Sequence, residues 1–188
     1  MNPEQSVFDT TFTAIDFETT GLYPATDRIV EFGGVQFKDG TVIATFDALV
    51  DPGVSVTAET LAITGISNEM LAGKPTIAET LPEFIRFIGE SIIVAHNAGF
   101  DVGFLRAALQ TAGLPDVKNP IIDTQLLAQK AFPGQRSYSL QNLVTFLQFP
   151  PNNAHRALDD SIMCMKLFEA CAREMSFMGD LPLSEVTT

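Results

Sequence analysis

The order of apolar segments in this chain predicts an α/β fold, with a mixed five-stranded sheet flanked by helices. Three strand-like segments come first, and Lys38-Asp39-Gly40, between the second and the third, is a hairpin turn signal. Further along, strand-like segments alternate with helical patterns. An antiparallel start followed by such alternation implies a mixed sheet with helices packed on it.

The expected strands are short and apolar. The fourth is a continuous apolar run, which is typical of a strand covered on both faces. We expect strands at residues 12–18, 29–37, 41–50, 91–95 and 121–122.

The expected helices are marked by capping and stop signals. Thr76 caps a long helix, and Glu79 three residues later completes a capping box. A proline-rich break at residues 149–153 precedes the last helix, and the final ten or so residues are expected to form a frayed tail. Besides the helix that Thr76 begins, we expect helices at residues 58–62, 68–71, 98–112, 124–131, 139–147 and 157–175.

The composition is that of one globular domain. With 188 residues, 46% of them apolar, the chain can bury a substantial core; we expect a single domain over 1–188, with its core over about 11–174 and short tails. No apolar run approaches the ~18–20 residues that cross a bilayer, and the N-terminus lacks the pattern of a signal peptide. The chain has only two cysteines, Cys164 and Cys171, and this small number argues against a disulfide framework and against a structural zinc site. A cytoplasmic protein away from the membrane is the default expectation.

The net charge of −12 limits how this chain could handle nucleic acid. Proteins that coat long stretches of duplex carry a basic surface. We therefore expect any contact with nucleic acid to involve a short end, held through metal ions and local contacts.

Asp16 and Glu18 lie two residues apart in the first apolar segment. Because a strand has a side-chain period of two, both project from the same face. Two close carboxylates resist burial unless a cation neutralises them, and paired oxygen ligands favour Mg²⁺ or Mn²⁺. The pair predicts one wall of a metal site.

Two further carboxylates fall on apolar helix faces. Asp101 is followed at helical spacing by Phe104 and Leu105, and Asp160 by Cys164, so both acids should face inward. Taken singly, each acid could instead begin a helix or join a buried salt bridge. With 11 Lys and Arg against 23 acids, however, separate salt bridges for all four are hard to supply. Two divalent cations about 4 Å apart would neutralise the four acids together.

His155 precedes Asp160 by five positions, which on one regular helix would turn the two side chains about 140° apart. To act at the same site, His155 must lie before the helix or in a distorted first turn. A histidine on a loop beside a metal carboxylate suits a mobile general base. The alternative is an ordinary surface histidine.

Three motifs carry these residues in order along the chain. They are Asp16-Phe17-Glu18-Thr19-Thr20-Gly21, His96-Asn97-Ala98-Gly99-Phe100-Asp101 and His155-Arg156-Ala157-Leu158-Asp159-Asp160. With them the chain resembles the DEDD-h (DnaQ-like) superfamily of 3′→5′ exonucleases, which have a ribonuclease H-like fold. Within it, the chain is most similar to the proofreading epsilon subunit of bacterial DNA polymerase III and to the exonuclease domain of Gram-positive replicative polymerases.

The resemblance implies a two-metal exonuclease that releases nucleoside 5′-monophosphates from DNA 3′ ends, in proofreading or repair. The implied metal ligands for two Mg²⁺ or Mn²⁺ ions are Asp16, Glu18, Asp101 and Asp160, with His155 as the base. The implied partners are single-stranded or frayed 3′ ends and a DNA polymerase subunit. The candidate substrate contacts are Thr19, Thr20, Gly21, Leu22, Glu59, Thr64, Asn97 and Phe100. For Phe100, an ordinary core position is an equal interpretation.

Three alternatives remain open at this point. One is an exoribonuclease that trims RNA 3′ ends or short oligoribonucleotides with the same motifs. Another is a non-catalytic module that keeps the fold as a scaffold, although such proteins usually lose an acidic ligand or the histidine, and here all five are present. The third is a small-molecule phosphatase or nucleotidase.

Overall fold

The computed structural model describes residues 2–150, 154–176 and 179–187, and it contains the predicted mixed sheet. Five strands lie in the order β3-β2-β1-β4-β5. The pairs β1–β2 and β2–β3 are antiparallel, whereas β1–β4 and β4–β5 are parallel. The strands are β1 (Phe12–Thr19), β2 (Ile29–Lys38), β3 (Thr41–Leu49), β4 (Ile92–Ala95) and β5 (Ile121–Asp123).

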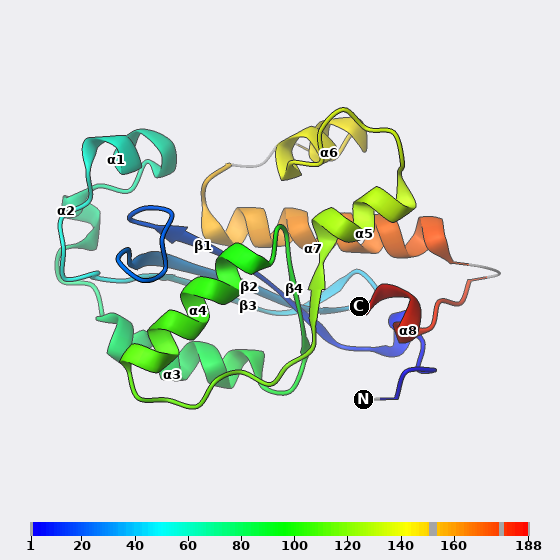
Figure 1. The fold of residues 1–188 in the computed structure, drawn as a ribbon, viewed down its shortest axis with the longest axis horizontal. Helices are drawn as coiled ribbons and strands as arrows, with labels where there is room; N and C mark the ends of the chain where they lie inside the picture. Colours follow the sequence, from blue (N-terminus) through cyan, green and yellow to red (C-terminus); the bar gives the residue numbers. More distant parts are fainter. Residues whose placement is uncertain (1, 151–153, 177–178, 188) are drawn as a thin grey trace.

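Helices cover both faces of the sheet, as Figure 1 shows. One face packs against α3 and α4, and the other against the long helix α7 with α5 beside it. The helices are α1 (Ala58–Thr64), α2 (Asn68–Leu71), α3 (Ile77–Ile88), α4 (Gly99–Thr111), α5 (Thr124–Ala131), α6 (Leu140–Phe146), α7 (Ala157–Met175) and α8 (Leu183–Val186), with a 3-10 turn, η1, at Val7–Asp9.

The two faces of β1 explain how the core is divided. Phe12 and Ala14 belong to the core cluster on the α7 side, whereas Ile15 and Phe17 belong to the cluster on the α3–α4 side. Because side chains alternate along a strand, Asp16 and Glu18 share the α7 side with Phe12 and Ala14. The acids thus continue an apolar row at the point where β1 leaves the core.

The structure contains the hairpin turn and the helix capping box that the sequence predicts. Asp39 and Gly40 both have positive φ, of 44° and 67°, in the tight turn between β2 and β3. Thr76 and Glu79 form the capping box of α3, in which the Thr76 N–H donates to Glu79 Oε2 at 2.8 Å. The proline-rich break was predicted at residues 149–153, of which 151–153 lie outside the described residues.

The prediction of a frayed C-terminal tail is wrong, and the N-terminal tail is also packed. Leu183 and Val186 of α8 are buried in the same core cluster as Val7. Ser6 bridges to Pro182, and the two ends of the chain lie close together in Figure 1. A four-residue helix is too short to show amphipathic periodicity, so the sequence pattern alone could not reveal it.

Candidate active site

The strand β1 extends beyond its parallel neighbour, and this overhang exposes the site. Its pairing with β4 ends at Ala14 opposite Val94. The first turn of α4 fills the free side of β1, where the N–H of Phe17 donates to Asp101 Oδ1 at 2.9 Å. The Asp101 carboxylate is thereby fixed against the strand segment that carries Asp16 and Glu18.

On the other side of β1, strand β2 lets α7 approach closely. Asp16 lies opposite Gly33 in the antiparallel register. A Cβ atom on Gly33 would overlap the carbonyl carbon and oxygen of Ala157, so a side chain at this position would clash with the first residue of α7. Because Gly33 has no side chain, the start of α7 can pack directly against the sheet. Asp160, about one turn further along the helix, is thereby held close to β1.

His155 lies two residues before the start of α7, outside the helix, as the spacing required. Its backbone is in the left-handed region, with φ of 64°, and its N–H donates to Asp160 Oδ2 at 2.7 Å. Ligand atoms of Glu18, His155 and Asp160 all lie within 4.8 Å of one another. The His155 side chain is exposed, whereas the two carboxylates are buried.

Residues from all three predicted motifs line one cavity of about 340 Å³. Asn97 and Phe100 also face it, although Phe100 contacts the Phe104 ring at 5.0 Å between centroids. Its lining comprises Asp16, Phe17, Glu18, His96, Asn97, Phe100, Asp101, Ser139, Leu140, Gln141, His155 and Asp160. Both interpretations of Phe100, a substrate contact and a packing residue, are compatible with this position.

The remaining predicted substrate contacts lie at the end of β1, on the loop that follows it and on α1, outside the lining of this cavity. Leu22 projects into solvent with 72% of its surface exposed. The carbonyl of Thr20 accepts a hydrogen bond from Thr60 Oγ1 at 2.8 Å, which ties α1 to the loop. The other members of this group are Thr19 at the end of β1, Gly21 on the loop, and Glu59 and Thr64 on α1.

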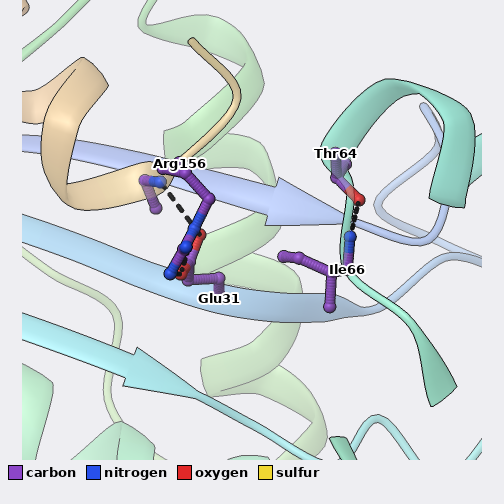
Figure 2. A network of polar contacts seen from close by, with 5 residues as sticks. Glu31, Thr64, Ile66 and Arg156 are labelled. Atoms are coloured by element: carbon purple, nitrogen blue, oxygen red, sulfur yellow. Dashed lines mark hydrogen bonds and ion pairs between the residues drawn. The ribbon is translucent and has the colours of Figure 1, made fainter. Parts of the chain in front are cut away.

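Thr64 differs from the others because its hydroxyl is already engaged. It donates to the carbonyl of Thr60 at 3.0 Å and accepts from the N–H of Ile66 at 3.1 Å, the second contact being drawn in Figure 2. Thr64 is also buried, whereas Glu59 is exposed. Of these two predicted contacts, Glu59 has the more accessible side chain.

Burial and neighbouring charges perturb the carboxyl groups of Asp16, Glu18 and Asp101. Burial and, next, the charges of neighbouring acids together raise the pKa of Glu18 from 4.5 to about 8. Burial also raises the pKa of Asp101 from 3.8 to about 7, although the hydrogen bond from the Phe17 N–H opposes this. The pKa of Asp16 lies well above its usual range because of burial and, next, the charges of Asp101 and Asp160. Carboxyl groups with such raised pKa values need a cation in order to ionise together.

The donor set fits divalent cations. Within the part of the chain that the structure describes, Asp16, Glu18 and Asp101 form no ion pair with a lysine or arginine. The carboxylates supply hard oxygen ligands, and the exposed imidazole of His155 stands beside them. The group is therefore suited to Mg²⁺ or Mn²⁺.

The sequence analysis missed an ion pair that adjoins this cluster. Glu31 on β2 lies opposite Glu18, is completely buried, and pairs with Arg156 at 2.7 Å, as Figure 2 shows. A charged residue within the apolar segment 29–37 was the available signal, because a buried carboxylate requires a partner.

Two supporting contacts were also missed. Asp123 accepts hydrogen bonds from the backbone N–H groups of Asn97 and Ala98, which fixes the segment before α4. The side chain of His96 lies within hydrogen-bonding distance of the Thr124 hydroxyl and the Tyr138 carbonyl, 2.9 Å from each. Both contacts hold the wall of the cavity.

The fold and the site together define a nuclease of the exonuclease class. The exonuclease family profile (RNase_T) matches residues 13–168, and the chain belongs to this family. It is 42% identical to the DNA polymerase III subunit epsilon of Treponema pallidum over 159 residues, which are 84% of this chain and 74% of that protein. It is also 42% identical to the PolC-type DNA polymerase III of Thermotoga petrophila over 97% of this chain, but it spans only 13% of the length of that relative.

Solved structures support the same family and fold. Exonuclease X in complex with 5′-overhanging duplex DNA superposes with a TM-score of 0.72 and 29% identity, covering 94% of this chain and 99% of that one. Exonuclease I of E. coli in complex with a dA16 oligonucleotide matches with a TM-score of 0.78 at 20% identity, over 89% of this chain and 42% of that one, which supports the fold alone. The predicted ribonuclease H-like fold and the predicted family are thus confirmed. No helix among the described residues has the length and apolar character to span a membrane.

Proposed function

We propose that this nuclease is a 3′→5′ exonuclease that removes nucleoside 5′-monophosphates from DNA 3′ ends with the help of two Mg²⁺ or Mn²⁺ ions. The observation that carries the proposal is the convergence of Asp16, Glu18, Asp101 and Asp160, from one strand and two helices, on a cavity that also receives His155. The relatives named as epsilon subunits, and exonuclease X bound to overhanging DNA, support DNA as the substrate.

The proposed mechanism assigns one role to each part of the site. Asp16, Glu18, Asp101 and Asp160 would hold the cations; when bound, such ions lower the pKa of a water and neutralise the departing 3′ oxygen. His155, exposed and beside Asp160, would accept the proton of the attacking water. The hydrogen bond between the His155 N–H and Asp160 keeps the base next to a ligand of the same site.

We further propose that the loop after β1 receives the terminal nucleotide. The exposed Leu22 would act as an apolar wedge against the last base, and the backbone amides of Thr19, Thr20 and Gly21 would contact the sugar. Glu59 would approach the same nucleotide from α1, which the contact between Thr60 and Thr20 holds beside the loop. Thr64 would act there mainly through packing, because its hydroxyl is already bonded within α1.

The role in the cell follows from the named relatives. Similarity to epsilon subunits and to PolC-type polymerases supports proofreading beside a DNA polymerase subunit, with repair as the related role. A cytoplasmic location stays a prediction from the composition and the cysteine pattern of the sequence.

A product assay on labelled oligonucleotides tests the proposal. Single-stranded DNA labelled at its 5′ end should shorten stepwise from the 3′ end with Mg²⁺, and should stay intact with EDTA. A primer with a 3′ mismatch should lose its last nucleotide faster than a fully paired primer, because a frayed end reaches the site more readily. Matched RNA should not be preferred over DNA, since no assigned contact recognises a 2′-hydroxyl. Activity in EDTA, release from the 5′ end, or a preference for RNA would contradict the proposal.

A further inference from the structure

Three consecutive residues before and at the start of α7 each donate to a carboxylate. The N–H of His155 donates to Asp160 Oδ2 at 2.7 Å. The guanidinium of Arg156 donates to Glu31 Oε1 through Nη2 at 2.7 Å and through Nε at 3.1 Å. The N–H of Ala157 donates to the other oxygen, Glu31 Oε2, at 2.9 Å. Both oxygens of Glu31 are thus occupied by the residues that follow His155.

The backbone of His155 needs such support. Its φ of 64° lies in the left-handed region, which is unfavourable for residues other than glycine. A residue persists in this conformation when the surrounding structure fixes it. The contact of Ala157 with Gly33 fixes the next turn against β2, and the Arg156–Glu31 pair fixes the residue between (Figure 2).

We propose that Glu31 and Arg156 are a positioning pair that fixes His155 in its left-handed conformation, and so aims the general base; this rests on the function proposed above. Glu31 has no exposed surface and cannot touch a substrate. An effect of Glu31 on turnover passes either through its contacts with Arg156 and Ala157 or through its charge opposite Glu18, and the exchange of the Ala157 amide distinguishes the two. Glu31 lies opposite Glu18 in the sheet register, so the pair ties the base to β2, the neighbour of the strand that carries Asp16 and Glu18.

Two other roles for Arg156 predict kinetic results that differ from those of a positioning role. A contact with a substrate phosphate would affect binding, because the Arg156 side chain is 42% exposed. A purely structural role would lower the amount of folded protein without changing turnover per folded molecule. A positioning role lowers kcat, leaves KM unchanged, and can be restored by a guanidinium that enters the vacated space.

The experiment compares Arg156→Ala, Glu31→Gln and a matched control, Arg173→Ala. Arg173 lies on the same helix and pairs with Asp39 of the β2–β3 turn at 3.0 Å, so it tests the loss of a similar ion pair at the far end of α7. Steady-state kinetics on single-stranded DNA with Mg²⁺ are measured per folded enzyme, with and without methylguanidinium. Hydrogen exchange of the His155 and Ala157 amides is measured in the same variants.

For Arg156→Ala we expect kcat to fall ~10–100-fold, because small misplacements of a reacting group cost up to this much. KM should stay unchanged, methylguanidinium should restore part of kcat, and the two amides should exchange faster. Glu31→Gln should lower kcat by a smaller factor, and Arg173→Ala should match the wild type. The proposed positioning role would be overturned by a normal kcat in Arg156→Ala, with or without a raised KM. An equal loss of kcat in the control Arg173→Ala would overturn it as well.

Amide exchange separates a failure of this pair from a failure of the proposed function. If the wild type releases no nucleotide from DNA, the proposed function fails, whereas the exchange rates still test the pair. Unchanged exchange of the Ala157 amide in Arg156→Ala would overturn the pair even in an active enzyme.

Discussion

Replacing Glu18 by glutamine should change how the stability of the metal-free protein depends on pH. Burial and neighbouring charges raise the pKa of Glu18 from 4.5 to about 8, so the folded protein holds this proton more tightly than the unfolded chain. A raised pKa of this kind contributes stability that is fully present below about pH 4.5 and is lost as the pH rises to about 8. Wild-type protein in EDTA should therefore become less stable over this window.

The size of the effect follows from the two pKa values. At about 1.4 kcal/mol per pH unit, the interval from 4.5 to about 8 gives an upper limit of roughly 5 kcal/mol for Glu18. For a domain of this length, 1 kcal/mol corresponds to about 2–4 °C in Tm, so the melting temperature should fall by as much as ~10–20 °C. Asp101, whose pKa rises to about 7, adds to the trend in the same direction but not independently, because the two acids interact.

Thermal melts in EDTA between about pH 5 and about pH 8.5 measure this directly. Glu18→Gln should have a much flatter profile than the wild type, and Mg²⁺ should raise the wild-type Tm most at high pH, where the carboxylates are ionised. Glu90→Gln, at an exposed position after α3, serves as the control and should follow the wild-type profile. Parallel profiles for wild type and Glu18→Gln would refute the reasoning.

Three further substitutions test separate parts of the structure. His155→Ala should lower turnover by ~10²-fold or more while calorimetric Mg²⁺ binding is retained, and full turnover at neutral pH would rule out the base. Gly33→Ala should cost at least ~1–3 kcal/mol in urea unfolding, because its Cβ would clash with Ala157, and it should weaken Mg²⁺ binding by displacing α7; wild-type values for both would contradict the close approach. Leu183→Ala should cost ~2–5 kcal/mol in urea unfolding, since this side chain is 1% exposed in the core, whereas a frayed tail would give no change.

Much of the site was predictable because it depends on local periodicity. The period of two placed Asp16 and Glu18 on one face, and helical phase placed Asp101 and Asp160 among buried residues, as the structure has them. The five-position spacing of His155 and Asp160 excluded one regular helix for both, and α7 indeed begins after His155. These inferences needed only the geometry of single elements.

The parts that were missed depend on contacts between distant segments. Glu31 and Arg156 are 125 residues apart, and their pairing requires the register of β2 against the start of α7. Nothing local to Gly33 shows that Ala157 will occupy the space of its side chain. The packing of Leu183 against the N-terminal segment is likewise a contact between the two ends of the chain.

The position of bound cations tests the central claim most directly. Crystals grown with Mn²⁺ and a nucleoside 5′-monophosphate would reveal the ions by anomalous scattering. The account predicts two peaks about 4 Å apart, within reach of Asp16, Glu18, Asp101 and Asp160. Mn²⁺ bound elsewhere, with none among these four carboxylates, would contradict it.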